Sequence, residues 1–161
     1  MADEKELTLS RDFDAPREVV WKAWTDPDIF MQWWGPRGFT TPISKIDLRK
    51  GGEYFNCMRA PDGQDFCSKG IYMEIVKPER LVITDSFADN DGNKVPATYY
   101  GMGTEFPMEM QVKVTFEEQN GRTKLIVKHS DVSNIRETEL KDMQQGWNES
   151  LDKLAELLAK S

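Results

Sequence analysis

Cysteine and histidine are scarce in this sequence, and their shortage excludes several kinds of site. The 161 residues include two cysteines, Cys57 and Cys67, and one histidine, His129. Two cysteines are too few for the disulfide framework of a small secreted domain, and these three residues cannot supply the four ligands of a structural zinc site. We therefore expect no metal, no cofactor and reduced thiols, as in a cytoplasmic protein.

Long apolar runs and clusters of positive charge are also missing. No apolar segment approaches the roughly 20 residues that cross a bilayer, and the N-terminal MADEKELTLS has no signal-peptide core. Lys and Arg total 21 against 28 Asp and Glu, which gives a formal net charge of -7, and the basic residues are spread singly. The sequence therefore predicts neither a membrane nor a nucleic acid as a partner.

The residues that are present are typical of one globular domain. Hydrophobic residues make up 39% of the chain and include five tryptophans, and disordered chains rarely carry so many aromatic residues. A chain of this length buries about 70% of its extended-state surface on folding. We expect a single domain over residues 1–161 with one hydrophobic core.

Periodic segments predict the order of the secondary structure. Residues 5–13 alternate as a strand does, and two helix start signals follow within residues 14–34. After Thr40, short apolar runs separated by turn residues indicate an antiparallel meander. The strongest hairpin signal is Asn120-Gly121, which joins a strand over residues 108–116 to the segment that follows it. These patterns predict one strand, two short helices and then a run of paired strands.

The last segment, residues 134–160, predicts a single long helix. Its apolar residues recur at steps of three and four: Leu140, Met143, Trp147, Leu151, Leu154 and Leu158. A helix of about 24 residues is roughly 36 Å long, enough to cross a small sheet. We expect an α+β fold with a curved antiparallel sheet of about seven strands, two short helices after strand one, and this helix across the concave face.

Five segments of the sequence resemble one known family. The segments are FDAPREVVWKAWTDPDIFMQWWGP, GGEYFNCMRAPDG, KPERLVITDSF, YYGMG and GWNESLDKLAELL. They resemble the activator of heat-shock protein 90 ATPase homologue family, an SRPBCC-domain family in the helix-grip superfamily of START and Bet v 1-like proteins. The resemblance implies a helix-grip fold with a cavity between the long helix and the sheet, and it covers nearly the whole chain.

Large apolar side chains from separate elements are the candidates for lining that cavity. They are Trp33, Trp34, Phe55, Met73, Tyr99, Tyr100, Met102, Met110, Trp147 and Leu151. The alternative is that these side chains simply fill a close-packed core, as we expect for Trp21 and Trp24. The irregular stretch over residues 88–105 is long enough to be a functional cover.

Two polar residues are weak candidates for catalysis. His129 continues the inward alternation of Leu125 and Val127, so it is a candidate general base or ligand contact, although a lone inward histidine is more often structural. Asp85 shares a strand face with Ile83, which places its carboxylate at the cavity rim or at a solvent-exposed strand end. Neither residue has a partner at a spacing that defines a catalytic set.

The two cysteines allow one geometric inference. If the turn at Pro61-Asp62-Gly63 closes an odd-numbered loop, Cys57 and Cys67 lie opposite each other on paired strands, within reach of a disulfide. An even-numbered loop would separate them. We expect the reduced form.

Three functions fit the sequence. The first is binding of a small apolar or aromatic molecule in the cavity; the second is a cavity enzyme such as a cyclase, dehydratase or hydrolase; the third is an interaction module for a chaperone or stress-related partner. Because no catalytic set and no exposed apolar patch can be identified, binding is the favoured function. We expect a monomer or a weak homodimer.

Overall fold

The computed structural model describes residues 6–102, 106–130, 132 and 135–160. The elements follow in the order β1 (Leu7–Phe13), α1 (Arg17–Thr25), α2 (Pro27–Phe30), β2 (Thr40–Ile46), β3 (Glu53–Arg59), β4 (Asp65–Val76), β5 (Arg80–Ala88), a 3-10 helix (Ala97–Tyr100), β6 (Met110–Gln119), β7 (Arg122–His129) and α3 (Glu137–Ala159). The first residue of the predicted long helix, residue 134, lies outside the described residues, as do residue 5 of the first strand and residues 103–105 of the irregular stretch.

The strands form one antiparallel sheet that follows the chain. Its order is β1-β7-β6-β5-β4-β3-β2, so only β1 joins the sheet out of sequence, beside β7. The predicted hairpin is confirmed: β6 and β7 pair through Asn120 and Gly121, whose φ angles of 54° and 80° are those of a tight two-residue turn. The strand begins at Met110 rather than at residue 108, because Met108 is exposed beyond the sheet.

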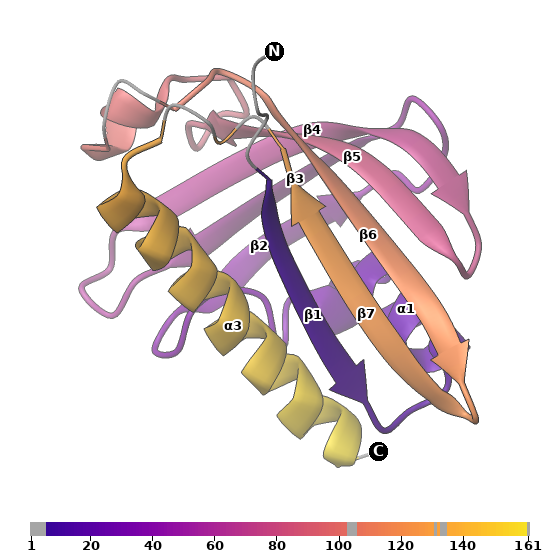
Figure 1. Ribbon diagram of the computed structural model, residues 1–161. Coiled ribbons are helices and arrows are strands. Elements are labelled where there is room, and N and C mark those ends of the chain that lie inside the picture. Colours follow the sequence, from indigo (N-terminus) through magenta and orange to yellow (C-terminus); the bar gives the residue numbers. More distant parts are fainter. Residues whose placement is uncertain (1–5, 103–105, 131, 133–134, 161) are drawn as a thin grey trace.

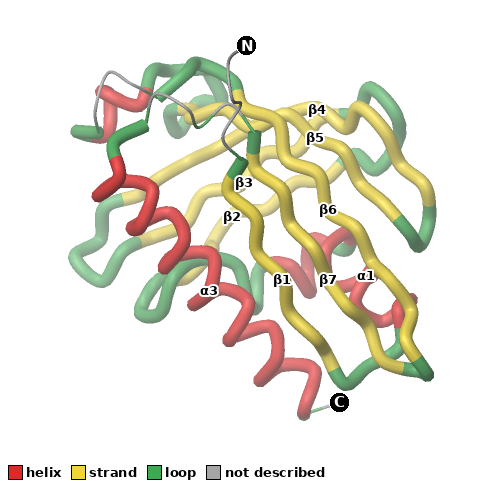
Figure 2. Tube along the Cα trace, in the orientation of Figure 1, coloured by secondary structure: helices red, strands yellow, loops and turns green. Residues whose placement is uncertain are grey.

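The sheet curls around α3, which confirms the predicted helix-grip architecture (Figure 1). The inward side chains of β6 and β7 alternate as the sequence predicts, and Val112, Val114, Leu125 and Val127 are buried. Helices α1 and α2 close one end of the hollow, where Trp21 packs edge-on against Phe116 with ring centroids 5.3 Å apart. Figure 2 shows the segment between β5 and β6 at the other end, where α3 begins.

The C-terminal half of α3 is fixed from two sides. Arg11 of β1 forms an ion pair with Asp152 at 2.7 Å. On the other side, the Ser150 hydroxyl accepts a hydrogen bond from the backbone N–H of Gly35 at 3.1 Å, and the Lys153 ammonium donates to the Gly35 carbonyl at 3.1 Å. Leu151 and Leu154 lie fully buried between these contacts. This half of the helix is therefore a structural anchor.

The expectation of reduced thiols is wrong in this structure. Cys57 and Cys67 form a disulfide, with Cα atoms 4.0 Å apart. The loop between β3 and β4 has the odd length that places the two residues opposite each other in register. Both cysteines point away from α3 and lie in a small buried cluster with Ala88 on the far side of the sheet. The disulfide therefore contributes to the outer layer of the fold and not to the hollow.

The disulfide predicts a simple chemical result. Protein purified without reductant and then denatured should show no free thiols in a thiol titration, and the same protein reduced before denaturation should show two. Equal thiol counts in the two samples, at two per chain, would contradict the disulfide.

Candidate functional site

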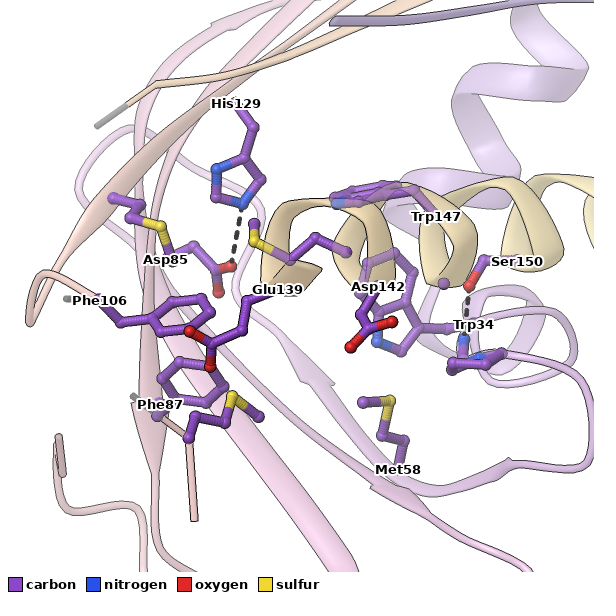
Figure 3. A pocket seen from close by; sticks show the side chains of 16 residues that line it. Trp34, Met58, Asp85, Phe87, Phe106, His129, Glu139, Asp142, Trp147 and Ser150 are labelled. Carbon is purple, nitrogen blue, oxygen red and sulfur yellow. Dashed lines mark hydrogen bonds and ion pairs between the residues drawn. The ribbon is translucent and has the colours of Figure 1, made fainter. Parts of the chain in front are cut away.

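A pocket of about 340 Å³ lies between the N-terminal half of α3 and the inner face of the sheet (Figure 3). Its lining is mainly apolar and comes from almost every part of the fold: Trp34, Gly35, Pro36, Met58, Asp85, Phe87, Met102, Phe106, Met110, His129, Glu139, Asp142, Met143, Gly146, Trp147 and Ser150. This volume lies within the range of about 300 to 1,000 Å³ that is usual for small-molecule sites.

The hollow exists because the two halves of α3 differ in how they meet the sheet. Leu151 and Leu154 fill the space beneath the C-terminal half, whereas the N-terminal half faces the pocket with Met143, Gly146 and Trp147. A glycine in a helix interior costs about 1 kcal/mol relative to alanine. A Cβ atom at Gly146 would meet only Pro36 Cγ within 4 Å, at 3.6 Å. The helix therefore has room at this position.

Two tryptophans form the inner wall of the pocket. The indole of Trp147 stacks on Trp24, with centroids 6.0 Å apart and an interplanar angle of 18°, and meets Trp34 edge-on at 5.0 Å. A second cavity of about 40 Å³ lies deeper in the core and shares Trp34, Asp85 and Trp147 with the pocket. The indoles of Trp34 and Trp147 thus lie at the boundary between the two spaces.

Asp85 is the polar centre of the sheet side of the pocket. The Tyr54 hydroxyl donates toward Asp85 Oδ1 at 2.9 Å and lies 2.8 Å from the carbonyl oxygen of Thr84. Asp85 Oδ2 is 3.8 Å from Nε2 of the buried His129, which is too far for a hydrogen bond. The structure therefore brings together the two weak polar candidates, His129 and Asp85, and adds Tyr54, which the sequence did not single out.

Burial and the nearby carboxylate keep Tyr54 protonated. Burial raises the pKa of Tyr54 well above its ordinary value, and the negative charge and hydrogen bond of Asp85 raise it further. Burial alone raises the pKa of the neighbouring Tyr72. At neutral pH Tyr54 is therefore a fixed hydrogen-bond donor to Asp85, and it holds one carboxylate oxygen in place.

The charges at the pocket are mostly negative. The carboxylates of Glu139 and Asp142 point from α3 into the same space that Asp85 faces from the sheet (Figure 3). Glu139 forms an ion pair with Arg136 at 3.3 Å. Among the described residues that line the pocket, none is Lys or Arg. Within the described part of the chain, these carboxylates do not form a group that could hold a metal ion.

The structure places six of the predicted site residues at the pocket. Besides His129 and Asp85, these are Trp34, Met102, Met110 and Trp147. Trp33 and Leu151 are instead fully buried core residues, and the indole N–H of Trp33 donates to the Ala23 carbonyl at 2.9 Å.

The other four predicted lining residues lie away from the pocket. Phe55 points to the outer face because its neighbours Tyr54 and Asn56 point inward, and it packs against the disulfide cluster. Met73 and Tyr99 are 48% and 56% exposed. Tyr100 packs against Phe66 and Phe87, and its hydroxyl accepts a hydrogen bond from the backbone N–H of Cys67 at 3.0 Å.

Several lining residues were missed by the sequence analysis. Met143 lies on the apolar stripe of α3, and Phe87 lies two residues from Asp85 on the same strand face, so the pattern held a signal for both. Met58 follows the inward alternation of Tyr54 and Asn56 in the same way. The remaining lining residues, such as Pro36, Phe106 and Gly146, follow no periodic pattern in the sequence. Only the tertiary structure brings them to the pocket.

The curved sheet and the long helix define a helix-grip protein, with a pocket between them. The chain belongs to the family described as activator of Hsp90 ATPase homolog 1-like protein, whose model matches residues 14–159. No curated protein matches the chain. Within the described part of the chain, no helix combines the length and the apolar character that a membrane span requires.

Solved bacterial structures share this fold over nearly the full chain. A protein from Chromobacterium violaceum is 28% identical, with a TM-score of 0.75 and coverage of 95% of this chain and 96% of that chain. The AHSA1 protein from Silicibacter pomeroyi is 25% identical, with a TM-score of 0.77 and coverage of 96% and 98%. A protein from Arthrobacter aurescens, at 23% identity, has a TM-score of 0.81 and coverage of 97% and 87%, and it supports the fold alone.

The hydrogen bond of Tyr54 predicts a loss of stability at neutral pH. Tyr54→Phe removes the donor to a carboxylate and should lower the free energy of unfolding by about 1.5 to 3 kcal/mol at pH 7. Tyr72→Phe is the matched control, because the Tyr72 hydroxyl makes no hydrogen bond to the described residues; it should cost less than about 1 kcal/mol. Urea denaturation of the three proteins measures these differences.

The raised pKa of Tyr54 also predicts how the free energy of unfolding depends on pH in the alkaline range. A raised native pKa means that the contribution of the neutral phenol is fully present below the ordinary pKa of 10.0 and is lost as the pH rises toward the native pKa. Stability of the wild type should therefore fall above pH 10 more steeply than that of Tyr54→Phe. Parallel pH profiles for these two proteins would contradict the assignment.

Proposed function

We propose that the protein binds a small molecule with an apolar or aromatic body in the pocket beneath the N-terminal half of α3. The observation that carries this proposal is a space of about 340 Å³ between α3 and the sheet, lined mainly by aromatic and methionine side chains. Methionine side chains are flexible and polarisable, and they adapt to ligands of different shape. Gly146 adds no side chain to the helix side of this space.

A second candidate is an enzyme that transfers a proton within the same pocket. The observation that favours it is the approach of Asp85 to His129, with Tyr54 hydrogen-bonded to the carboxylate. In this candidate, the Asp85 carboxylate accepts a proton from a bound molecule. Its test is incubation of ligand extracted from the purified protein with fresh protein and with His129→Gln. Mass-spectrometric recovery of unchanged ligand from the wild type would contradict turnover.

The proposed compartment is the cytoplasm, and the disulfide is compatible with it. Thiol exchange requires access to a sulfur atom, and Cys57 and Cys67 are only 0% and 1% exposed.

The proposed oligomeric state is a monomer or a weak homodimer. A chaperone partner is an expectation from the family alone, and fold families host many functions.

A blocked pocket tests the binding proposal. Gly146→Phe should place a ring in the pocket and weaken binding of the neutral probe 2-(1-naphthyl)ethanol at least about tenfold, measured by isothermal titration calorimetry. Gly146→Ala is the matched control: its methyl group meets Pro36 Cγ at an ordinary 3.6 Å, so measurable binding and a more stable helix are expected. Thermal unfolding of both variants checks the fold.

Two results would contradict the proposal. One is the absence of measurable binding of the naphthyl probe to the wild type. The other is equal affinity in the wild type and in a folded Gly146→Phe protein, which would place the bound probe elsewhere.

A further inference from the structure

We propose that the natural ligand is an amphipathic cation, whose ammonium group donates to Asp85 Oδ2 while its apolar body lies against Trp34 and Trp147. This inference rests on the proposed binding function and adds the chemical class of the ligand. Three features of the pocket carry it: the sign of the charges around it, the hydrogen-bonding state of Asp85, and the aromatic and sulfur surfaces beside that carboxylate.

The first feature is the sign of the charges that face the pocket. Asp85, Glu139 and Asp142 face the pocket, and no described lining residue is Lys or Arg. Glu139 is paired with Arg136, and Lys153 donates to the carbonyl oxygens of Gly35 and Phe39 beside the C-terminal half of α3. An anionic ligand would therefore meet the like charge of Asp85, whereas a cation would neutralise it.

The second feature is the state of the Asp85 carboxylate. Oδ1 is held by the Tyr54 hydroxyl, whereas Oδ2 accepts no hydrogen bond from the described residues and lies 3.8 Å from His129 Nε2. The side chain is 29% exposed, so water reaches it when the pocket is empty. A bound apolar molecule would displace this water, and a buried carboxylate without a partner is costly. A ligand whose ammonium group donates a hydrogen bond to Oδ2 replaces the water that Asp85 loses.

The third feature is the surface on which a cation and an apolar group can both rest. Trp34 and Trp147 line the pocket together with Asp85, and an ammonium group near an indole face is attracted by its π electrons. Met58, Met110 and Met143 supply polarisable sulfur and methyl groups for the rest of the ligand. The pocket thus combines one anionic acceptor with an apolar body site, which is the complement of an amine that carries an aromatic or aliphatic group.

The test compares three probes that share one ring system: 2-(1-naphthyl)ethylamine, 2-(1-naphthyl)ethanol and 1-naphthylacetic acid, which are cationic, neutral and anionic at pH 7. Calorimetry on the wild type should give an affinity for the amine at least about tenfold above that for the alcohol, because a charge-assisted hydrogen bond exceeds a neutral one. The acid should bind most weakly. Repeating the titrations at higher salt separates a local pair from the general attraction of a chain with net charge -7.

Two variants assign the preference to its residue. Asp85→Asn conserves the shape of the side chain and the acceptor for Tyr54, and it should reduce the ratio of amine to alcohol affinity to about one. Asp12→Asn removes the same charge from the exposed outer side of β1, away from the pocket, and should retain the preference. Thermal unfolding of both variants confirms that they fold.

The outcomes separate the two proposals. Equal binding of amine and alcohol by the wild type overturns the cationic class and leaves the pocket as a site for neutral molecules. A preference that survives Asp85→Asn, or that disappears with salt alone, overturns the role of Asp85. If none of the three probes binds, the binding function itself fails.

Discussion

The anchoring of one half of α3 is the constraint on which the rest of the structure depends. The ion pair of Arg11 with Asp152 ties the helix to β1, at one edge of the sheet, and Ser150 and Lys153 tie it to the segment that leads into β2, at the other edge. Leu154 fills the core between these ties. Because the helix is rigid, its N-terminal half must continue along the same axis while the curved sheet falls away beneath it. The pocket follows from this geometry, and the segment between β5 and β6 adds Met102 and Phe106 to its wall.

Within the pocket, shape alone does not distinguish charged from neutral ligands, whereas the charge of the lining does. Aromatic and methionine side chains accept many apolar molecules, and in the proposed function the partly exposed carboxylate of Asp85 selects among them by charge. Tyr54 fixes Asp85 through a phenol that burial keeps protonated, so the carboxylate is held in place before any ligand arrives. Family membership defines the architecture, and in the proposed function the side chains that line the pocket select the ligand.

The sequence predicted the architecture well and the pocket only in part, for reasons that individual residues illustrate. Alternation identified the inward faces of β6 and β7, including His129, because strand periodicity is a local property. It could not place Phe55, since its direction depends on a register that the aromatic character of the residue does not reveal. The stripe on α3 included both Trp147 and Leu151, yet only the tertiary position of the helix separates a pocket wall from a core residue. The cysteine pairing depended on the length of one loop, which composition leaves open.

The central claim is that a ligand enters the space beneath the N-terminal half of α3, and methionine methyl resonances report on that space directly. Protein labelled with carbon-13 at its methionine methyl groups can be titrated with 2-(1-naphthyl)ethylamine and followed by two-dimensional NMR. Ring currents from the bound probe should shift the methyl signals of Met58, Met110 and Met143, which line the pocket, and leave those of Met31 and Met73 in place. Shifts confined to Met31 and Met73, or saturable binding that moves none of the pocket methyl signals, would contradict the account.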